Sequence, residues 1–147
     1  MTAPNRSIVQ ALESLNSEFA CVAGVGVDLV NVDTLKRLLA SNLSPFLDMA
    51  WTSVEQRDAA DDPERLAARW AAKEAVMKSL GRGLGDVDPL DVEILHDHGG
   101  RPIARLHGAA ASTAEQAGVE DIYISMAHED GWAIAFAVVS LLSENSS

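Results

Sequence analysis

The stretch "PERLAARWAAKEAVMKSLG" at residues 63–81 carries the clearest structural signal in the chain. Asp62, just before it, is a good N-cap, Pro63 suits the first turn of a helix, and Gly81 suits a C-terminal stop. Apolar side chains at helical spacing form one stripe, made of Leu66, Trp70, Met77 and Leu80, and alanines over most of the remaining surface permit close packing. The sequence therefore predicts a long central helix over Glu64–Leu80.

The stretch "GVGVDLV" at Gly24–Val30 predicts a strand that begins near Cys21. Because side chains alternate along a strand, Gly26 and Asp28 share one face. Glycines leave that face open, which is typical of close approach by a ligand or another backbone. Asp28 itself has two interpretations, a cap for the following helix or a ligand for a hard cation. A dinucleotide-binding G-x-G-x-x-G pattern is excluded, since Leu29 stands at its last glycine.

The rest of the chain predicts an α+β fold in a single domain. Helical spacing predicts four shorter helices, at Ser7–Ala20, Asp33–Ala40, Val54–Ala60 and Ala109–Gly118. Alternation and turn residues predict two hairpins, Asp91–His96 with Pro102–His107 and Asp121–His128 with Trp132–Ser140. Proline breaks "SPFLDMAW" (44–51), which is not expected to form one element. We therefore expect a mixed or antiparallel sheet packed on the long central helix.

Composition limits the class of protein. The 147 residues have a formal net charge of −11, which argues against a general nucleic-acid binder. No apolar run reaches the roughly 18 residues of a membrane span, and the N-terminus lacks the order of a secretory signal. One cysteine, Cys21, excludes an internal disulfide and a thiolate zinc cage. The expected location is cytoplasmic, with no nucleic-acid or membrane partner, and any anionic ligand requires the few basic residues to be concentrated at its site.

Charged residues on the long helix are the first candidates for chemistry. Glu74 and Lys78 are four apart, which is typical of an exposed ion pair worth roughly 0.3–0.5 kcal/mol. Lys73 falls inside the apolar stripe, where a lysine must either extend outward or meet a fixed anion. With Arg69 one turn earlier, the helix offers three cations and one carboxylate near a single edge. Such a set suits a phosphate bridged by Mg²⁺, which takes one or two protein carboxylates.

Three further features admit a structural and a functional interpretation. Gly81 opens "GRGLG", whose amides could contact phosphate, although a helix C-cap is the simpler interpretation. His128 ends a predicted strand, where a histidine is usually structural. His96 and His98 resemble a metal pair, yet "HDHGGRP" has the composition of a hairpin turn.

Together, "GVGVDLV", "RWAAKEAVMKSLG" and "ISMAHE" resemble the holo-acyl-carrier-protein synthases, the small class of 4′-phosphopantetheinyl transferases. The resemblance covers about residues 22–140. It implies a 4′-phosphopantetheinyl transferase-like fold and transfer of phosphopantetheine from coenzyme A to a serine of an apo acyl carrier protein or carrier domain. It also implies release of adenosine 3′,5′-bisphosphate, in fatty-acid or polyketide synthesis. The family also implies a homotrimer with sites between subunits.

The resemblance also assigns roles by motif position. Asp28 and Glu74 are the implied Mg²⁺ ligands, and Glu74, Lys78 and His128 the implied catalytic residues. Coenzyme-binding residues are implied at five positions: Arg69, Lys73, Lys78, Gly81 and His128. The serine proton would go to Glu74 or to a metal-held water, and the sequence leaves both open.

Some features depart from the family pattern. Ala127 stands where the family often has a hydroxyl, which leaves a non-catalytic coenzyme A or nucleotide-binding module as the alternative. The predicted carrier-docking strip comprises Lys36, Arg37, Arg57 and Arg65, which would need to attract an acidic carrier. The predicted division is an N-terminal helical extension at 1–20, a transferase domain at 21–142 and a tail at 143–147.

Overall fold

A computed structural model describes residues 21–41, 45–82 and 86–141 of the chain, and it is built around a three-stranded sheet. The strands are β1 (Cys21–Asn31), β4 (Val119–Glu129) and β5 (Trp132–Leu141). They are antiparallel and lie in the order β1-β5-β4. The register aligns Asp28 with Ala135, and Ala135 with Met126, so β1 and β4 form the two edges of this sheet.

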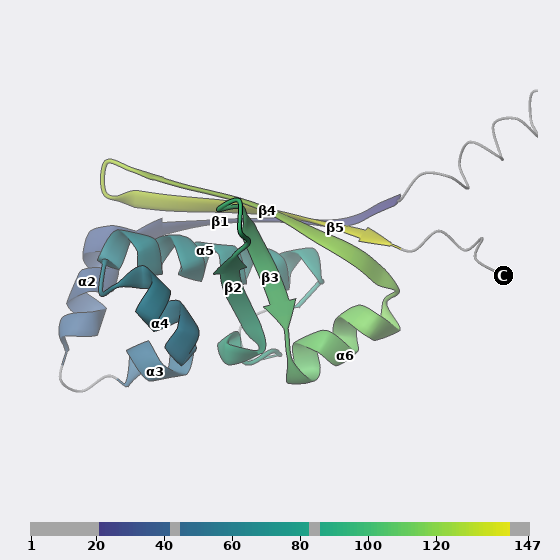
Figure 1. Cartoon of the computed structure of the whole chain (residues 1–147), viewed down its shortest axis with the longest axis horizontal. Helices are drawn as coiled ribbons and strands as arrows, with labels where there is room; N and C mark the ends of the chain where they lie inside the picture. The colour runs from purple at the N-terminus through teal and green to yellow at the C-terminus, as the bar shows by residue number, and fades with distance from the viewer. Residues whose placement is uncertain (1–20, 42–44, 83–85, 142–147) are drawn as a thin grey trace, which may run out of the picture.

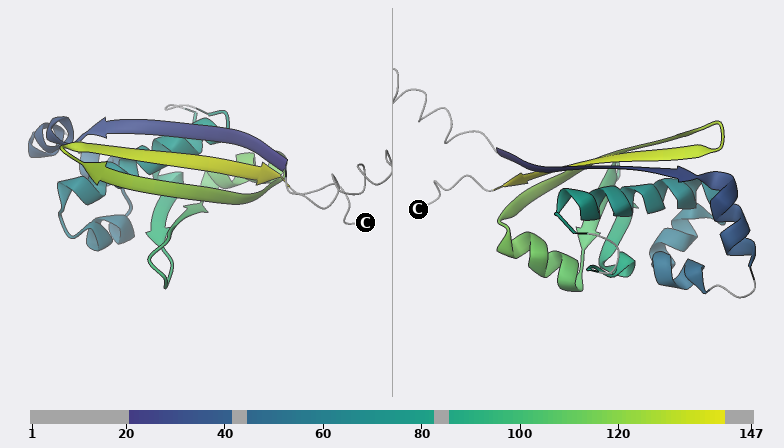
Figure 2. Two further views of the ribbon diagram at one scale, coloured as in Figure 1. Left: turned by 90° about the horizontal axis from the view of Figure 1, so that it is seen from above. Right: turned by 180° about the vertical axis from the view of Figure 1, so that it is seen from behind.

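Helix α5 (Pro63–Ser79) packs against one face of this sheet, as Figures 1 and 2 show. Its N-terminus has the predicted Asp62 cap, which accepts a hydrogen bond from the Glu64 amide at 2.9 Å. The glycines of β1 make the close approach possible, because a Cβ at Gly24 or Gly26 would overlap a carbonyl oxygen of α5. The space that the two glycines leave on β1 is therefore filled by the helix backbone and not by a ligand.

The remaining elements lie on the same side of the sheet as α5 (Figure 1). On one flank lie α2 (Val32–Ala40), α3 (Phe46–Ala50) and α4 (Ser53–Ala59). On the other lie the 3-10 turn η1 (Pro89–Asp91), the separate hairpin of β2 (Val92–His96) with β3 (Pro102–Leu106), and α6 (Gly108–Gln116). The core forms between these elements and α5, whose alanines Ala71, Ala72 and Ala75 are fully buried.

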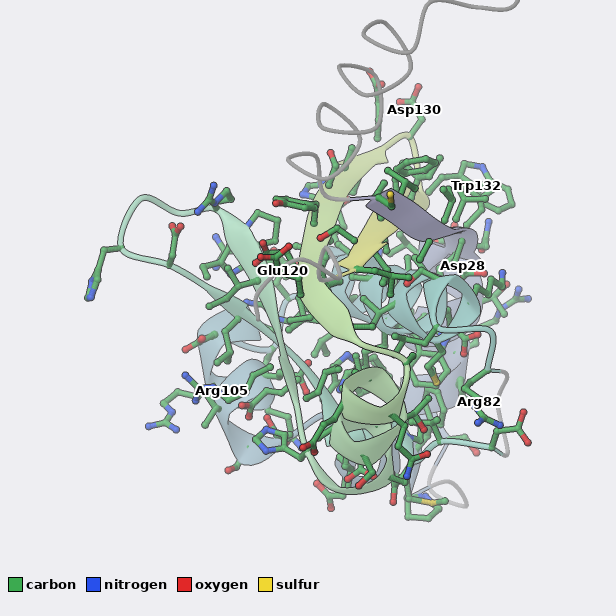
Figure 3. All side chains as sticks on the ribbon, turned by 90° about the vertical axis from the view of Figure 1, so that its right-hand side faces the viewer. Asp28, Arg82, Arg105, Glu120, Asp130 and Trp132 are labelled. Carbon is green, nitrogen blue, oxygen red and sulfur yellow. The ribbon has the colours of Figure 1, made fainter. Side chains whose placement is uncertain are left out.

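The outer face of the sheet has no covering element among the described residues (Figure 2). Seven large apolar side chains on it are 45–56% exposed: Val25, Val27, Leu29, Tyr123, Trp132, Ile134 and Phe136. We call this set the bare face. Trp132 and Asp28, labelled in Figure 3, lie on opposite faces of the sheet, because Asp28 shares the inner face with the glycines and Trp132 projects outward. A contiguous apolar surface of this kind is typical of a protein interface.

The α+β fold and the sheet packed on a long helix are confirmed, and every strand pairing among the described residues is antiparallel. One expectation was wrong in detail, because Phe46–Ala50 within the broken stretch forms the short helix α3 after Pro45. Proline disrupts a helix interior but is tolerated just before the first turn. The predicted helix at Ser7–Ala20 and the tail at 143–147 lie outside the described residues. Within the described ranges, no helix is both long and apolar enough to cross a membrane.

Candidate functional site

Asp28 meets the C-terminal half of α5 at the edge of the sheet. The Lys78 ammonium donates to Asp28 Oδ1 at 2.8 Å and to the Val27 carbonyl at 3.0 Å. The Asp28 side chain is 18% exposed and that of Lys78 is 49% exposed. The cluster therefore opens to solvent on the Lys78 side, and a ligand has access to it.

Glu74 lies one turn before Lys78 and faces the same cluster. Its side chain is 9% exposed, and its buried Oε1 has no hydrogen-bond partner among the described residues. Burial raises the pKa of Glu74 above its usual value, the negative charge of Asp28 raises it further, and Lys78 opposes both. Two neighbouring carboxylates with an unsatisfied buried oxygen form a site of excess negative charge, which a cation would neutralise.

This geometry decides two of the alternatives left open by the sequence. Asp28 does not cap α2, because Asn31 Oδ1 accepts the hydrogen bond from the Thr34 amide at 2.9 Å. Lys78 pairs with Asp28 and not with Glu74, so the expected ion pair within the helix is not the contact observed. Within the described part of the chain, Glu74 is thereby left without a fixed cationic partner.

The donor set fits Mg²⁺. The described residues contain no group of three or more His, Cys, Asp or Glu side chains placed to hold a metal. Two carboxylates, from Asp28 and Glu74, are what Mg²⁺ commonly takes from a protein, with water and substrate phosphate completing its octahedron. The unpartnered Glu74 Oε1 is the atom that most directly supports this assignment.

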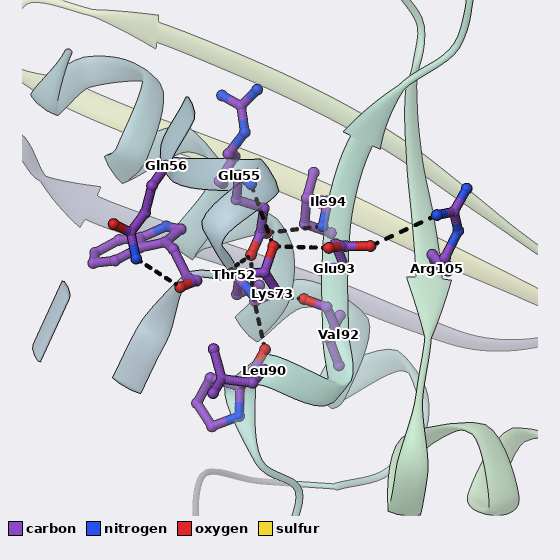
Figure 4. Close-up of polar contacts among 12 residues, drawn as sticks. Thr52, Glu55, Gln56, Lys73, Leu90, Val92, Glu93, Ile94 and Arg105 are labelled. Atoms are coloured by element: carbon purple, nitrogen blue, oxygen red, sulfur yellow. Dashed lines mark hydrogen bonds and ion pairs between the residues drawn. The ribbon is translucent and has the colours of Figure 1, made fainter. Parts of the chain in front are cut away.

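Lys73 lies away from the carboxylates. The expectation that it binds phosphate does not agree with its contacts. The side chain is 0% exposed, and its ammonium lies 2.8 Å from Glu55 Oε2, 2.8 Å from the Pro89 carbonyl and 2.7 Å from the Val92 carbonyl (Figure 4). Three acceptors satisfy the three donors of a lysine. Lys73 therefore has no donor left for a ligand, and it fastens α5 to α4 and to the start of β2.

Arg69 also lies apart from the carboxylates, so the predicted single edge of charges was wrong. Arg69 and Lys78 are nine positions apart, and at 100° per residue they point to opposite sides of α5. Arg69 lines a pocket of about 430 Å³ together with Arg65, His96 and His128. We call this hollow, whose other lining residues are Asp58, Ala68, Met126 and Ala127, the basic pocket.

Two of the residues expected to bind the coenzyme, Arg69 and His128, both line the basic pocket. His128 is exposed, and its Nδ1 lies 3.1 Å from Glu64 Oε2. Asp28 and His128 come from the two opposite edge strands of the sheet. A single chain therefore holds two candidate half-sites, one of carboxylates and one of basic groups, on different sides of α5.

Sequence reasoning missed several residues of the basic pocket. His96 was assigned to a turn, Arg65 to a docking strip, and Asp58 to no function. Only the packing of β2 beside α5 brings His96 to Arg69, 27 positions away, with 3.4 Å between His96 Nδ1 and an Arg69 terminal nitrogen. No spacing rule signals such a pair, although four basic groups in a chain of net charge −11 are notable once they share a pocket.

Gly81 has the geometry of a helix C-terminus. It adopts a φ of 72°, and the next amide, that of Arg82, donates to the Met77 carbonyl at 2.9 Å. This is the structural interpretation of the glycine. Gly81 also lies beside Lys78 in the lining of a shallow hollow, so a ligand held by Lys78 would come near it.

An apolar groove of about 370 Å³ runs from the carboxylates along α2. Asp28 and Glu74 line one part of it, and Leu38, Phe46 and Trp70 line the remainder with five other residues. No basic side chain of the described residues lines this groove. The groove thus differs from the basic pocket in the charge of its lining, and it suits an uncharged, partly apolar segment of a ligand.

Residues 24–137 match the sequence model of the 4′-phosphopantetheinyl transferase superfamily. The chain belongs to this superfamily. Its enzymatic class is accordingly that of a 4′-phosphopantetheinyl transferase. The match includes Asp28, Glu74, Lys78 and His128, so both half-sites fall inside the family domain.

Curated relatives in this superfamily cover most of the chain. A holo-[acyl-carrier-protein] synthase of Frankia casuarinae is 42% identical over 117 residues, which are 80% of this chain and 96% of that protein. One from Herpetosiphon aurantiacus is 37% identical over 120 residues, or 77% of this chain and 94% of that protein.

Solved structures agree with this assignment. The holo-[acyl-carrier-protein] synthase of Neisseria meningitidis superposes with a TM-score of 0.74 at 30% identity, covering 81% of this chain and 98% of that one. The enzyme of Helicobacter pylori in complex with coenzyme A gives 0.72 at 25% identity, covering 79% and 99%.

Proposed function

We propose that this chain transfers 4′-phosphopantetheine from coenzyme A to a serine of an apo acyl carrier protein, in a reaction that needs Mg²⁺. The observation that carries the proposal is the Asp28–Glu74–Lys78 cluster, with its unpartnered buried carboxylate oxygen, inside the family domain. In the reaction, the serine oxygen bonds to the phosphorus that bears pantetheine. The bond from that phosphorus to the adenosine phosphate breaks, and adenosine 3′,5′-bisphosphate leaves.

Asp28 and Glu74 would hold the metal between them. When bound, Mg²⁺ supplies positive charge at the pyrophosphate and helps to orient it. Lys78 stands at the open side of the cluster, and its ammonium can move from Asp28 to the departing phosphate. The proposed contribution of these side chains is alignment and charge neutralisation, which is most of what phosphoryl transfer needs from a protein.

The serine proton requires an acceptor near the carboxylates. Glu74 is the protein group in the right place to accept it. A water held by the metal is the other acceptor.

Coenzyme A has an anionic nucleotide end and an uncharged pantetheine arm, and the two hollows match these ends. The basic pocket, with Arg69 and His128, suits the phosphates of the nucleotide end. The groove that passes Leu38 and Trp70, lined by no basic side chain of the described residues, suits the arm. Since the basic pocket and the groove lie on different sides of α5, one coenzyme A would use the carboxylates of one subunit and the basic pocket of a neighbour.

We infer a homotrimer from the same arrangement. The bare face offers the apolar surface that such an assembly would bury, and β1 and β5 carry most of it. A closed ring of three repeats one heterologous contact. Each contact would bring His128 at one sheet edge toward Asp28 of the next subunit.

For the acyl carrier protein, the proposed docking surface is the outer side of α2. Lys36 and Arg37 are exposed there, and Arg57 is exposed on α4. Lys36 pairs with Asp33 at 3.7 Å, a weak surface pair that an acidic partner can replace. Arg65 belongs to the basic pocket and is removed from this set.

The experiment that tests the proposal is the intact mass of an apo acyl carrier protein after incubation with the enzyme, coenzyme A and Mg²⁺. The expected result is a gain of one phosphopantetheine that EDTA abolishes and excess Mg²⁺ restores. Transfer that persists in EDTA would contradict the metal assignment.

A binding module without turnover is the competing candidate. Ala127 favours it, since this residue lines the basic pocket without a hydroxyl. Coenzyme A binding in the absence of any mass gain, across several apo carriers, would establish that candidate instead.

A further inference from the structure

The basic pocket has an incompletely satisfied arginine in its lining. Arg69 is 4% exposed, and its Nε is buried without a hydrogen-bond partner in the described part of the chain. Its remaining contacts are long: one terminal nitrogen lies 3.4 Å from the Arg65 carbonyl and the other 3.4 Å from His96 Nδ1. Burial lowers the pKa of Arg69, and no carboxylate forms an ion pair with it among the described residues. A buried guanidinium with a free donor is arranged for an anion.

His96 also lines the pocket, and it accepts a hydrogen bond from Arg69 in only one protonation state. Nδ1 accepts the hydrogen from Arg69 when it carries no proton of its own. Burial lowers the pKa of His96, and Arg69 lowers it further. The pocket without a ligand therefore holds His96 neutral, as an acceptor for the arginine.

The charged groups around His96 come from each neighbouring element. Arg65 and Arg69 on α5 disfavour its cation, while Asp58 on α4 and Asp97 in the hairpin turn favour it. His128 of β4 also lines the pocket, and its Nδ1 lies 3.1 Å from Glu64 Oε2 of α5. Among the residues that line the pocket, two guanidinium groups, those of Arg65 and Arg69, accompany one carboxylate, that of Asp58, and a bound anion would add negative charge beside His96.

A phosphomonoester dianion would change the contacts of both side chains. Arg69 would turn its donors from His96 to the phosphate oxygens, which leaves Nδ1 without a hydrogen to accept. A protonated Nδ1 can then donate to the same phosphate, and the imidazolium faces an opposite charge in place of a guanidinium. The histidine thus changes from an acceptor for arginine to a donor for phosphate.

We propose that His96 binds the ribose phosphomonoester of coenzyme A in the basic pocket and takes up a proton as it does so. The inference rests on the proposed function, since it names coenzyme A as the ligand. The source of the proton is solvent, and the bound state holds more protons than the free state. By linkage, the affinity for coenzyme A rises as the pH falls through the interval between the free and bound pKa values of His96.

The phosphate itself contributes with the opposite sign. Its second pKa is about 6, so binding to cations releases the small fraction of phosphate protons present near pH 7. Net proton uptake at pH 7 can therefore not come from the ligand. It must come from a protein group, and the variants and the ligand analogue below identify which one.

The test is titration calorimetry of the intact protein with coenzyme A at pH 7, in several non-phosphate buffers of different ionisation enthalpy. We expect net uptake of between zero and one proton per coenzyme A, and a dissociation constant that falls by up to about tenfold per pH unit below pH 7. His96→Asn keeps a neutral acceptor for Arg69 and should lose most of the uptake. His98→Asn removes a histidine two positions away, outside the basic pocket, and should retain it.

Two further arms locate the proton and the phosphate. 3′-Dephospho-coenzyme A should bind without net uptake, because it lacks the phosphomonoester, and uptake that persists with it would overturn the assignment. His128→Asn should keep most of the proton uptake. If His128→Asn instead lost all of the uptake while His96→Asn retained it, the proton would be assigned to His128 and the inference would be refuted. Normal phosphopantetheine transfer accompanied by no uptake would refute this inference alone, while absence of coenzyme A binding at every pH would refute the proposed function.

Discussion

Glu74 combines burial, a neighbouring carboxylate and an unpartnered oxygen, and each of these costs stability. Native proteins seldom leave a buried acceptor unpaired, because the lost hydration is not recovered. Burial and Asp28 together raise the pKa of Glu74, so its charged form is disfavoured in the folded chain. Such a cost is expected where a bound cation completes the site.

We predict that Glu74→Gln lowers phosphopantetheine transfer by at least about a hundredfold while the melting temperature stays the same or rises, since an amide removes the buried charge but is a poor Mg²⁺ ligand. Transfer is measured by carrier mass and stability by thermal unfolding in EDTA. Glu115→Gln, at an exposed position on α6, is the matched control and should change neither. A Glu74→Gln variant that remained fully active in Mg²⁺ would contradict the metal assignment.

At the scale of elements, the spacing of β1 from α5 decides whether the site forms. Gly24 lies against the Ser79 carbonyl, and Gly26 against the Ala75 carbonyl. Backbone contacts of this kind cannot relax as a flexible side chain would. The close approach that they allow places Asp28 within reach of Lys78.

Gly26→Ala should therefore destabilise the fold by about 2 kcal/mol or more, because the added methyl group overpacks the helix–strand contact. Urea unfolding followed by tryptophan fluorescence measures the change. Gly24→Ala should behave alike, since its Cβ would meet the same helix one turn later. Wild-type stability of the Gly26→Ala variant would show that α5 does not rest on this strand as described.

Lys73 holds α5 against α4 and β2, on the side away from β1. It joins a continuous polar network in which Glu55 also accepts from the Thr52 and Ile94 amides, at 2.8 Å each. Thr52 in turn donates to Glu93 Oε2 at 2.7 Å (Figure 4). This network fixes how α5 is rotated, and hence that Glu74 faces Asp28 while Arg69 faces the basic pocket.

We expect Lys73→Met to cost roughly 3–5 kcal/mol of stability, because it leaves the Glu55 charge buried without its partner. Adding Glu55→Gln should recover part of the loss by removing that charge. Chemical unfolding of the two variants and the single Glu55→Gln change provides the measurement. If Lys73→Met unfolded like the wild type and only weakened coenzyme A binding, the phosphate-binding role would be reinstated.

At the scale of the whole molecule, the two half-sites call for a second subunit. Asp28 and His128 occupy opposite edges of a sheet whose outer face is bare among the described residues (Figure 2). Phe136 stands in the middle of that face, 45% exposed on the central strand. An assembly that buries it also joins the edges of neighbouring sheets.

Subunit mixing tests this arrangement. Asp28→Ala and His128→Ala should each be inactive, whereas co-refolding them at equal amounts should restore about a quarter of the wild-type activity, since a quarter of the contacts pair two intact half-sites in a random ring. Mixing either variant with itself is the control. Failure of the mixture to recover activity would show that both half-sites act within one chain.

Phe136→Glu should convert the proposed trimer to monomers and abolish transfer without unfolding the chain, because it would place a charge in the proposed apolar interface. Light scattering coupled to size-exclusion chromatography measures the mass. Glu120→Gln, at an exposed position on β4 outside the bare face, should leave the mass unchanged. A Phe136→Glu variant that stayed trimeric would place the interface elsewhere.

By itself, the sequence predicted most of the described helices and strands, and the motif resemblance named Asp28 and Glu74 as one metal site. The Asp62 cap and the apolar stripe located α5, and strand alternation placed Asp28 on the inner face, because both signals are local and periodic. Tertiary structure decided what each charge contacts. Lys73, which shares a motif with Glu74, turned inward to Glu55, while His96, in an apparent turn, reached Arg69. These outcomes depend on residues 18 and 27 positions apart, and contacts at such separation follow from how helices pack on a sheet, which no local pattern encodes.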